Sequence, residues 1–193
     1  NPKESPHDFF ELGHTSVSID LALGIAKARN LLGGTEKVIA VIGDGSLSGG
    51  EALEGLNTAG EFEGQFLILV NDNQMSIAEN HGGLYASLKA LRESNGTSEN
   101  NLFRAMGLDY RYEAAGNDIG ALIRALNAVK DVDHPLVLHI NTLKGKGYEP
   151  AETRKEEFHW HFPFDRESGV TLPDFRFEGE SYEEATADFL RKA

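Results

Sequence analysis

Residues 38–45 read Val-Ile-Ala-Val-Ile-Gly-Asp-Gly, and residues 66–73 read Phe-Leu-Ile-Leu-Val-Asn-Asp-Asn. Each stretch is a short apolar run that ends in a polar cluster. Runs this short and this apolar are typical of strands buried on both faces of a parallel sheet. In open α/β sheets, ligands bind outside the carboxyl ends of such strands, where both polar clusters fall. The two stretches therefore predict a ligand site at the carboxyl end of a sheet.

The rest of the chain alternates between helical and strand patterns. We expect helices at 16–30, 48–60, 101–106 and 118–130, and further strands at 110–114 (an edge strand) and 136–141. Thr15 or Ser16 is expected to cap the first helix, and Ser48 with Glu51 fits a capping box for the second. This alternation predicts an α/β fold, a mostly parallel sheet with helices on both faces.

The pattern changes from about Gly145 onward. Residues 149–180 show little periodicity, which is unusual inside a compact domain and predicts an irregular C-terminal arm. Ser181 and Glu184 form another capping box, ahead of a short helix at 185–190. We therefore divide the chain into a ligand-binding domain at 1–148 and a linker arm at 149–193.

Composition narrows the function classes. The chain has 193 residues, 40% of them hydrophobic, and a formal net charge of −13, which argues against a nucleic-acid-binding surface. No apolar run approaches the ~20 residues of a membrane helix, so we expect no membrane partner. The absence of cysteine excludes disulfides and thiolate metal sites, and is compatible with the cytoplasm, where we expect the protein.

The polar clusters suit a hard divalent cation. Magnesium prefers oxygen ligands, and Asp44 supplies a carboxylate while Asn73 supplies an amide oxygen from the neighbouring strand end. The backbone carbonyl of Met75 is a further candidate ligand. Gly45 leaves room for phosphate oxygens to approach the backbone. Gly-Asp-Gly alone is common in ordinary turns, but its pairing with a second cluster favours a metal and diphosphate site.

This pattern resembles the thiamine diphosphate and magnesium motif of thiamine-dependent enzymes. Three stretches sharpen the resemblance: Gly-His-Thr-Ser at 13–16, Asn-Asp-Asn-Gln-Met-Ser-Ile-Ala-Glu-Asn at 71–80, and Lys-Gly-Lys-Gly-Tyr-Glu-Pro-Ala-Glu at 144–152. They are similar to the 1-deoxy-D-xylulose-5-phosphate synthase family of the transketolase superfamily. The similarity covers about residues 8–165, and the stretch at 71–80 is its most specific part.

The resemblance implies a role for each matching residue. Asp44, Asn73 and the carbonyl of Met75 would bind Mg²⁺, Gly45 and Ser46 would contact the diphosphate, Gly13, His14 and Thr15 would lie against the cofactor with His14 as a catalytic residue, and Tyr148 would lie close to the cofactor. Asn73 would contact the cofactor as well as the metal. Asp72 is expected to be structural, because strand alternation turns its side chain away from the ion.

The resemblance also implies a reaction. Family members join a two-carbon unit from pyruvate to glyceraldehyde 3-phosphate, and a glutamate from a separate pyrimidine-binding domain activates the cofactor. Because the cofactor site would lie between domains, we expect a homodimer. We expect this chain to be the diphosphate-binding part of such an enzyme, to need the remaining segments of that enzyme, and to be inactive alone.

Two alternatives stay open. The stretch between Asn73 and Tyr148 is shorter than in typical family members, so a transketolase-like enzyme with another sugar phosphate substrate is the first. A non-catalytic metal- or nucleotide-binding module is the second. The remaining histidines are also undecided: His81 is a candidate for the substrate side, while His159 and His161 suit arm packing or a substrate-side contact better than a metal site.

Overall fold

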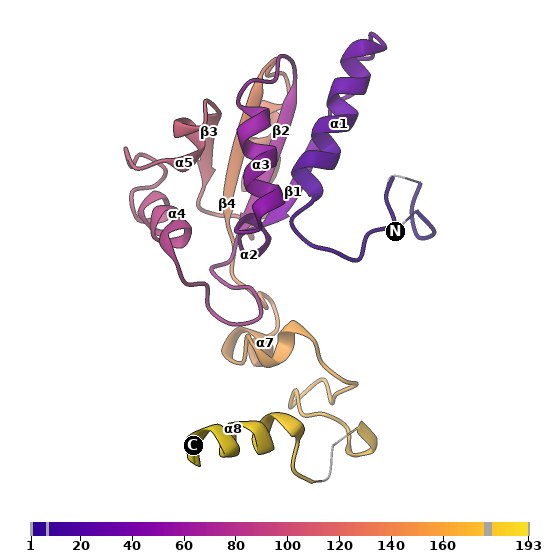
Figure 1. The fold of residues 1–193 in the computed structure, drawn as a ribbon, viewed down its shortest axis with the longest axis vertical. Helices are drawn as coiled ribbons and strands as arrows, with labels where there is room; N and C mark the ends of the chain where they lie inside the picture. The colour runs from indigo at the N-terminus through magenta and orange to yellow at the C-terminus, as the bar shows by residue number, and fades with distance from the viewer. Residues whose placement is uncertain (1, 7, 176–178, 193) are drawn as a thin grey trace.

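The computed structural model describes residues 2–6, 8–175 and 179–192, and at its centre these residues form a sheet of four parallel strands (Figure 1). The strands are β1 (Ile39–Gly43), β2 (Phe66–Asp72), β3 (Asp109–Glu113) and β4 (Pro135–Asn141). Their spatial order is β1-β2-β4-β3, so β2 and β4 are central and β3 is the expected edge strand.

Helices cover both faces of this sheet, which confirms the predicted fold class. One face carries α1 (Ser18–Leu31), α3 (Gly50–Ala59), α4 (Gly83–Glu93) and α5 (Leu102–Ala105), and the other carries α6 (Ile119–Val129). The connections β1 to β2 and β2 to β3 cross the sheet in one direction, whereas β3 to β4 returns. Because parallel crossovers are right-handed, the returning connection places its helix on the opposite face.

The strands divide their side chains between two cores by alternation. Ile68 and Val70 of β2 face the larger core, together with Leu56 of α3 and Phe103 of α5. The smaller core lies under α6 and contains apolar side chains of β2, β4 and the helix: Leu67, Leu136, Leu138, Ile140, Leu122 and Leu126. Burial on both faces holds the strand ends, and therefore the candidate site, in fixed register.

The first strand departs from the sequence analysis, which expected it to be buried on both faces. Ile39 is 48% exposed and Val41 is 60% exposed, while the alternate residues Ala40 and Ile42 are buried. α6 packs over β2 and β4, and no other element in the described part of the chain covers this side of β1.

Two predicted helix caps are wrong. Ser48 has helical backbone angles and ends a short helix, α2 (Asp44–Leu47), so its hydroxyl donates to the carbonyl of Gly45 instead of capping α3. Gly49, in extended conformation, is the residue that precedes α3. At the first helix Ser16 has a φ of 77°, and Val17 occupies the N-cap position without a capping hydrogen bond from its side chain. Neither serine caps the expected helix, because neither has the extended backbone conformation that is typical of an N-cap residue.

The sequence analysis also placed no element at α4. Leu84, Leu88 and Leu91 recur at helical spacing, and the last two are buried against the larger core. This periodicity was sufficient to predict the helix, which matters because α4 forms one wall of the candidate site.

The C-terminal arm lies beyond the carboxyl ends of the strands, as Figure 1 shows. It contains α7 (Glu149–Thr153), two 3₁₀ turns (Glu157–His159 and Pro173–Phe175) and α8 (Tyr182–Lys192). The capping box before α8 forms as predicted: the backbone N–H of Ser181 donates to Glu184 at 2.8 Å, and that of Glu184 donates to the Ser181 hydroxyl at 3.1 Å. Among the described residues, every helix is too short or too polar to span a lipid bilayer.

Candidate functional site

The register of the sheet brings the two polar clusters together. Gly43 pairs with Asn71, so Asp44 begins α2 at the same edge of the sheet where β2 ends. Asn73 follows β2 directly, and the two residues line one cavity. Neighbouring parallel strands end side by side, and this geometry is what the sequence pattern anticipated.

Asp44 is the buried acid of the site, with 1% of its surface exposed. Its Oδ1 accepts a hydrogen bond from the backbone N–H of Asn73 at 3.4 Å, and its Oδ2 accepts one from the carboxamide of Asn80 at 2.8 Å. Burial, followed by the negative charge of nearby Asp72, raises the pKa of Asp44 to about 6. A cation beside Asp44 would favour its charged form.

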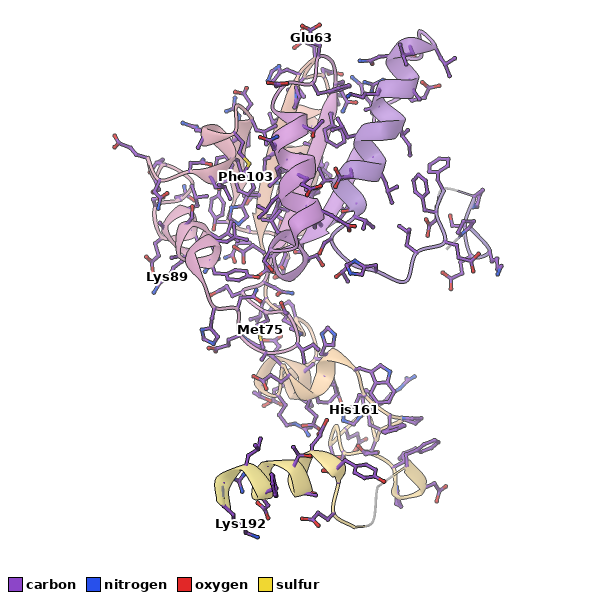
Figure 2. The ribbon with its side chains drawn as sticks, viewed as in Figure 1. Glu63, Met75, Lys89, Phe103, His161 and Lys192 are labelled. Atoms are coloured by element: carbon purple, nitrogen blue, oxygen red, sulfur yellow. The ribbon has the colours of Figure 1, made fainter. Side chains whose placement is uncertain are left out.

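The turn after β2 is held by its own side chains. Asn73 Oδ1 accepts from the backbone N–H of Met75 at 3.0 Å, and Asp72 Oδ1 accepts from that of Gln74 at 3.0 Å. Gln74 has a φ of 68°, in the left-handed region, and Met75 forms an isolated bridge with Glu79. The turn therefore folds back on itself, and Figure 2 shows Met75 between the sheet and the arm.

Gly45 has no space for a side chain. A Cβ on this residue would lie 2.2 Å from the Oγ and 3.0 Å from the Cβ of Ser76. The loop after β1 therefore contacts the side chain of Ser76 in the loop after β2, and glycine at position 45 allows this close approach.

The segment at 13–16 reaches the same loop from the N-terminal side. A Cβ on Gly49 would lie 2.2 Å from the Oγ of Ser16, so the two turns are in contact. His14 is exposed, its Nδ1 contacts the carbonyl oxygen of Thr15, and Nδ1 lies 4.0 Å from a carboxylate oxygen of Glu51. A carbonyl oxygen only accepts, so this contact assigns the proton to Nδ1 and leaves Nε2 as an acceptor.

Lys144 is a site residue for which the sequence left the role undecided. Its Nζ donates to the carbonyl of Ser76 at 2.5 Å and to that of Ile77 at 3.2 Å, and lies 3.3 Å from Nδ1 of His159. Partial burial lowers the pKa of Lys144, opposed by the charges of Asp44 and Glu156. The lysine therefore joins the loop after β2 to the arm.

Tyr148 directly precedes the arm and packs against it. Its hydroxyl donates to the carbonyl of Arg166 at 2.9 Å, and its ring packs edge-on against Phe158 with centroids 5.6 Å apart. His161 belongs to the same aromatic cluster, with Nε2 3.0 Å from Glu157, and Figure 2 shows it in the arm. The side chain of Tyr148 does not line the cavity at Asp44, in contrast to that of His81, which does.

The cavity has a volume of about 490 Å³ and lies between the turn after β2 and α4. Asp44, Asn73 and Met75 line it, and Tyr85, Lys89 and Arg92 of α4 form its opposite wall. Within the ranges that the structure describes, no three His, Asp or Glu side chains form a metal-binding group. The available donors are instead a carboxylate, a carboxamide and a carbonyl, all hard oxygens of the kind that magnesium prefers.

Asn80 and Arg92 are the contributors that the sequence analysis did not single out. Asn80 closes the stretch at 71–80, and the buried leucines of α4 predict a helix whose last turn contains Arg92. No local sequence pattern indicates the partner of Asn80 or of Arg92, because both contacts span 20 or more positions of the chain.

Comparisons with known proteins show which proteins this chain is similar to. A family model described as 1-deoxy-D-xylulose-5-phosphate synthase matches residues 1–99. Proteins of that name from Porphyromonas gingivalis and Chlorobium phaeovibrioides are 42% and 39% identical to this chain, over 88% and 87% of it and 32% of each relative. The chain thus spans about a third of the length of the curated relatives it matches.

The alignments also show a difference in length. The match to the Chlorobium protein extends over 206 residues, more than the 193 of this chain, although it covers only 87% of the chain. The relative therefore contains residues inside the aligned region that have no counterpart here.

One solved structure is similar in fold. It is described as a thiamin diphosphate-dependent enzyme from Mycobacterium smegmatis, and it superposes with a TM-score of 0.50 at 22% identity, over 68% of this chain and 22% of that chain. At this identity the similarity supports the α/β fold.

Proposed function

This chain belongs to the 1-deoxy-D-xylulose-5-phosphate synthase family, and we propose that it forms the diphosphate-binding part of a thiamine diphosphate-dependent transferase. The enzyme would join a two-carbon unit from pyruvate to glyceraldehyde 3-phosphate. The observation that supports this most directly is the buried carboxylate of Asp44, held at 3.4 Å by the backbone of Asn73 at the ends of adjacent strands.

Each residue has a definite part in this proposal. Asp44, Asn73 and the carbonyl of Met75 would bind Mg²⁺, Gly45 and Ser46 would accommodate the diphosphate, Gly13, His14 and Thr15 would lie along the cofactor, and Tyr148 would approach it from the arm. The hard oxygen donors that line the cavity fit that group. Thiamine diphosphate, when bound, supplies the electron sink for the two-carbon transfer.

His14 is the candidate for proton handling. With the proton on Nδ1 directed at the carbonyl of Thr15, its Nε2 is available to accept a hydrogen bond or a proton from the substrate side. The exposed position of His14 beside the turn at Ser16 and Gly49 supports this assignment.

The proposal includes an assembly. Residues 1–148 would be the binding domain and 149–193 the arm that leads to a pyrimidine-binding domain, with the cofactor between domains of a cytoplasmic homodimer. The separate aromatic cluster of Tyr148, Phe158 and Phe164 supports treating the arm as a unit of its own.

A transketolase-like enzyme acting on another sugar phosphate is the second candidate. The residues that the relatives contain inside the aligned region and this chain lacks favour it. A shorter connection beside the site would change the walls that contact substrate, while leaving Asp44 and Asn73 unchanged.

Calorimetric titration with thiamine diphosphate tests the cofactor assignment. We expect binding that needs Mg²⁺ and that is lost in Asp44→Ala, whereas Asp109→Asn, at the opposite end of the sheet, should bind normally. Binding that is indifferent to Mg²⁺ would support a non-catalytic nucleotide-binding module instead. Assays of the native protein with pyruvate and with ketose phosphate donors then distinguish the two transferases.

A further inference from the structure

Asp72 lies at the centre of a buried polar network behind the candidate site. It is the last residue of β2 and has no exposed surface. Its Oδ2 accepts a hydrogen bond from Arg92 of α4 and lies 2.9 Å from Nε2 of His139 on β4. A buried carboxylate is tolerated only when it is paired and hydrogen-bonded, and Asp72 has both kinds of partner.

The network continues away from the site through His139. This histidine is fully buried, and its Nδ1 lies 2.8 Å from the hydroxyl of Tyr110 on β3. The Asp72 carboxylate is an acceptor, so Nε2–H of His139 donates to it. Nδ1 of His139 is then the acceptor for the Tyr110 hydroxyl. The ring centroids of Tyr110 and Tyr112 lie 6.0 Å and 5.1 Å from the ring centroid of His139, and this packing fixes the orientation of the imidazole.

The other oxygen of Asp72 holds the turn that contains the proposed metal ligands. Oδ1 accepts from the backbone N–H of Gln74 at 3.0 Å, and Gln74 lies between Asn73 and Met75. Gln74 has a φ of 68°, a left-handed conformation that is unfavourable for a residue other than glycine. The hydrogen bond to Asp72 stabilises that conformation and so fixes the direction of the flanking residues.

We propose that Arg92, His139 and Tyr110 are positioning residues for the metal turn, which act through Asp72 on Asn73 and Met75. This role rests on the proposed function, because those two residues are the proposed ligands. His139 of β4 and Arg92 of α4 contact one oxygen of Asp72 directly, and Tyr110 of β3 reaches it through His139. The other oxygen of Asp72 holds the turn, so the network couples the core to the site.

The alternative is that the network only stabilises the fold. The two roles differ in what a mutation changes. Disruption of a purely structural network would speed hydrogen exchange of all backbone amides of the sheet together. Disruption of a positioning network would loosen the turn and weaken metal binding in molecules that remain folded.

The test uses the full chain with Arg92→Met, Arg92→Lys and Tyr110→Phe, and with Arg124→Met as control. Arg124 is an exposed arginine of α6, on the other face of the sheet, and it does not line the cavity. Two quantities are measured at low temperature, where circular dichroism shows the variant folded: amide hydrogen exchange of Gln74 without metal, and Mn²⁺ affinity with thiamine diphosphate present.

We expect Arg92→Met to speed exchange at Gln74 about ten-fold and to weaken Mn²⁺ binding about ten-fold, with Val70 in β2 unchanged. Arg92→Lys should recover part of both effects, and Arg124→Met should match the parent. Tyr110→Phe removes one hydroxyl from the network, so it provides a milder version of the test if Arg92→Met does not fold; it should give a smaller change of the same kind.

Some outcomes overturn the proposal. In Arg92→Met, equal acceleration of amide exchange at Gln74 and Val70, or a Mn²⁺ affinity within two-fold of the parent, would show that the network is structural only. If Arg92→Met does not fold, unchanged Gln74 exchange and unchanged Mn²⁺ affinity in Tyr110→Phe would show the same. In each of these cases the proposed function stands. If the parent chain itself binds no Mn²⁺, the proposed function fails and the positioning role fails with it.

Discussion

The carboxamide of Asn80 donates a hydrogen bond of 2.8 Å to Oδ2 of Asp44, across 36 positions of the chain. The same side chain accepts from the hydroxyl of Ser76 at 2.6 Å. Asn80 therefore ties the buried acid of α2 to the far end of the loop after β2, and it closes the cavity wall beside the proposed metal ligands.

Replacement of Asn80 by alanine should weaken the site from its outer side. Asp44 loses a charge-assisted hydrogen bond, so we expect metal-free stability to fall by about 1–3 kcal/mol and Mg²⁺ affinity to fall about ten-fold. Urea unfolding and metal titration measure the two effects. Asn57→Ala, an exposed position on α3, should leave both unchanged. Equal metal affinity in Asn80→Ala and the parent would contradict a role in orienting Asp44.

Asp44 should make the metal-free chain less stable as pH rises. Its folded pKa of about 6 lies above the reference value of 3.8, so the folded state binds more protons between these values and its stability decreases across that window. We expect Asp44→Asn to be more stable than the parent by roughly 3 kcal/mol at pH 7 in EDTA, and about equally stable near pH 4.

Urea unfolding at both pH values checks this expectation. The pKa of Asp72 is lowered, because the hydrogen bond from His139 and the charge of Arg92 outweigh its burial, so its contribution changes only below pH 3.8 and does not mask the effect. A parent and an Asp44→Asn variant with the same stability difference at pH 4 and pH 7 would disprove the shift.

Gly45→Ala should destabilise the chain by crowding Ser76. The added Cβ would be 2.2 Å from the Ser76 hydroxyl and 3.2 Å from its Cα, so the loop after β2 must move, at a cost of about 1–3 kcal/mol. Gly43→Ala is the matched control, since a Cβ there meets nothing within 4 Å. Thermal or urea unfolding gives both values, and adding Ser76→Gly to Gly45→Ala should recover most of the loss.

His161 should make the arm sensitive to pH. The carbonyl of Phe162 and the carboxylate of Glu157 raise the pKa of His161, so its stabilising contact is complete below pH 6.5 and is lost as pH rises through the raised pKa. Trp160, the single tryptophan, reports this change by fluorescence.

We expect a fluorescence transition with its midpoint above pH 6.5 that disappears in His161→Gln. His134→Gln, which removes another histidine of raised pKa at the opposite end of the sheet, should keep the transition. A transition that persists in His161→Gln would assign it to a different group.

The sequence pattern predicted some contacts of the candidate site and not others. Apolar runs at 38–42 and 66–70 predicted strands, and parallel strands necessarily end at one edge, so the approach of Asp44 to Asn73 followed without coordinates. The contacts of Asn80 and Arg92 did not follow, because a carboxamide or guanidinium pairs with any acid that the fold brings within reach.

Two capping boxes of the same form illustrate this division. The box of Ser181 and Glu184 forms, with both of its reciprocal hydrogen bonds, as the local pattern predicts. The box of Ser48 and Glu51 does not, because α2 ends at Ser48 in a helical conformation and its hydroxyl donates to Gly45.

By itself the sequence determined the elements whose cause is local: the strands, the α/β class and the polar residues at the strand ends. Periodic burial and turn chemistry depend on neighbours within a few positions, which a sequence displays directly. Only the tertiary structure decided that Arg92 pairs with Asp72, that Asn80 holds Asp44 and that the side chain of Tyr148 packs in the arm. Those contacts depend on how the helices and the arm pack against the sheet, and that packing is a property of the whole chain.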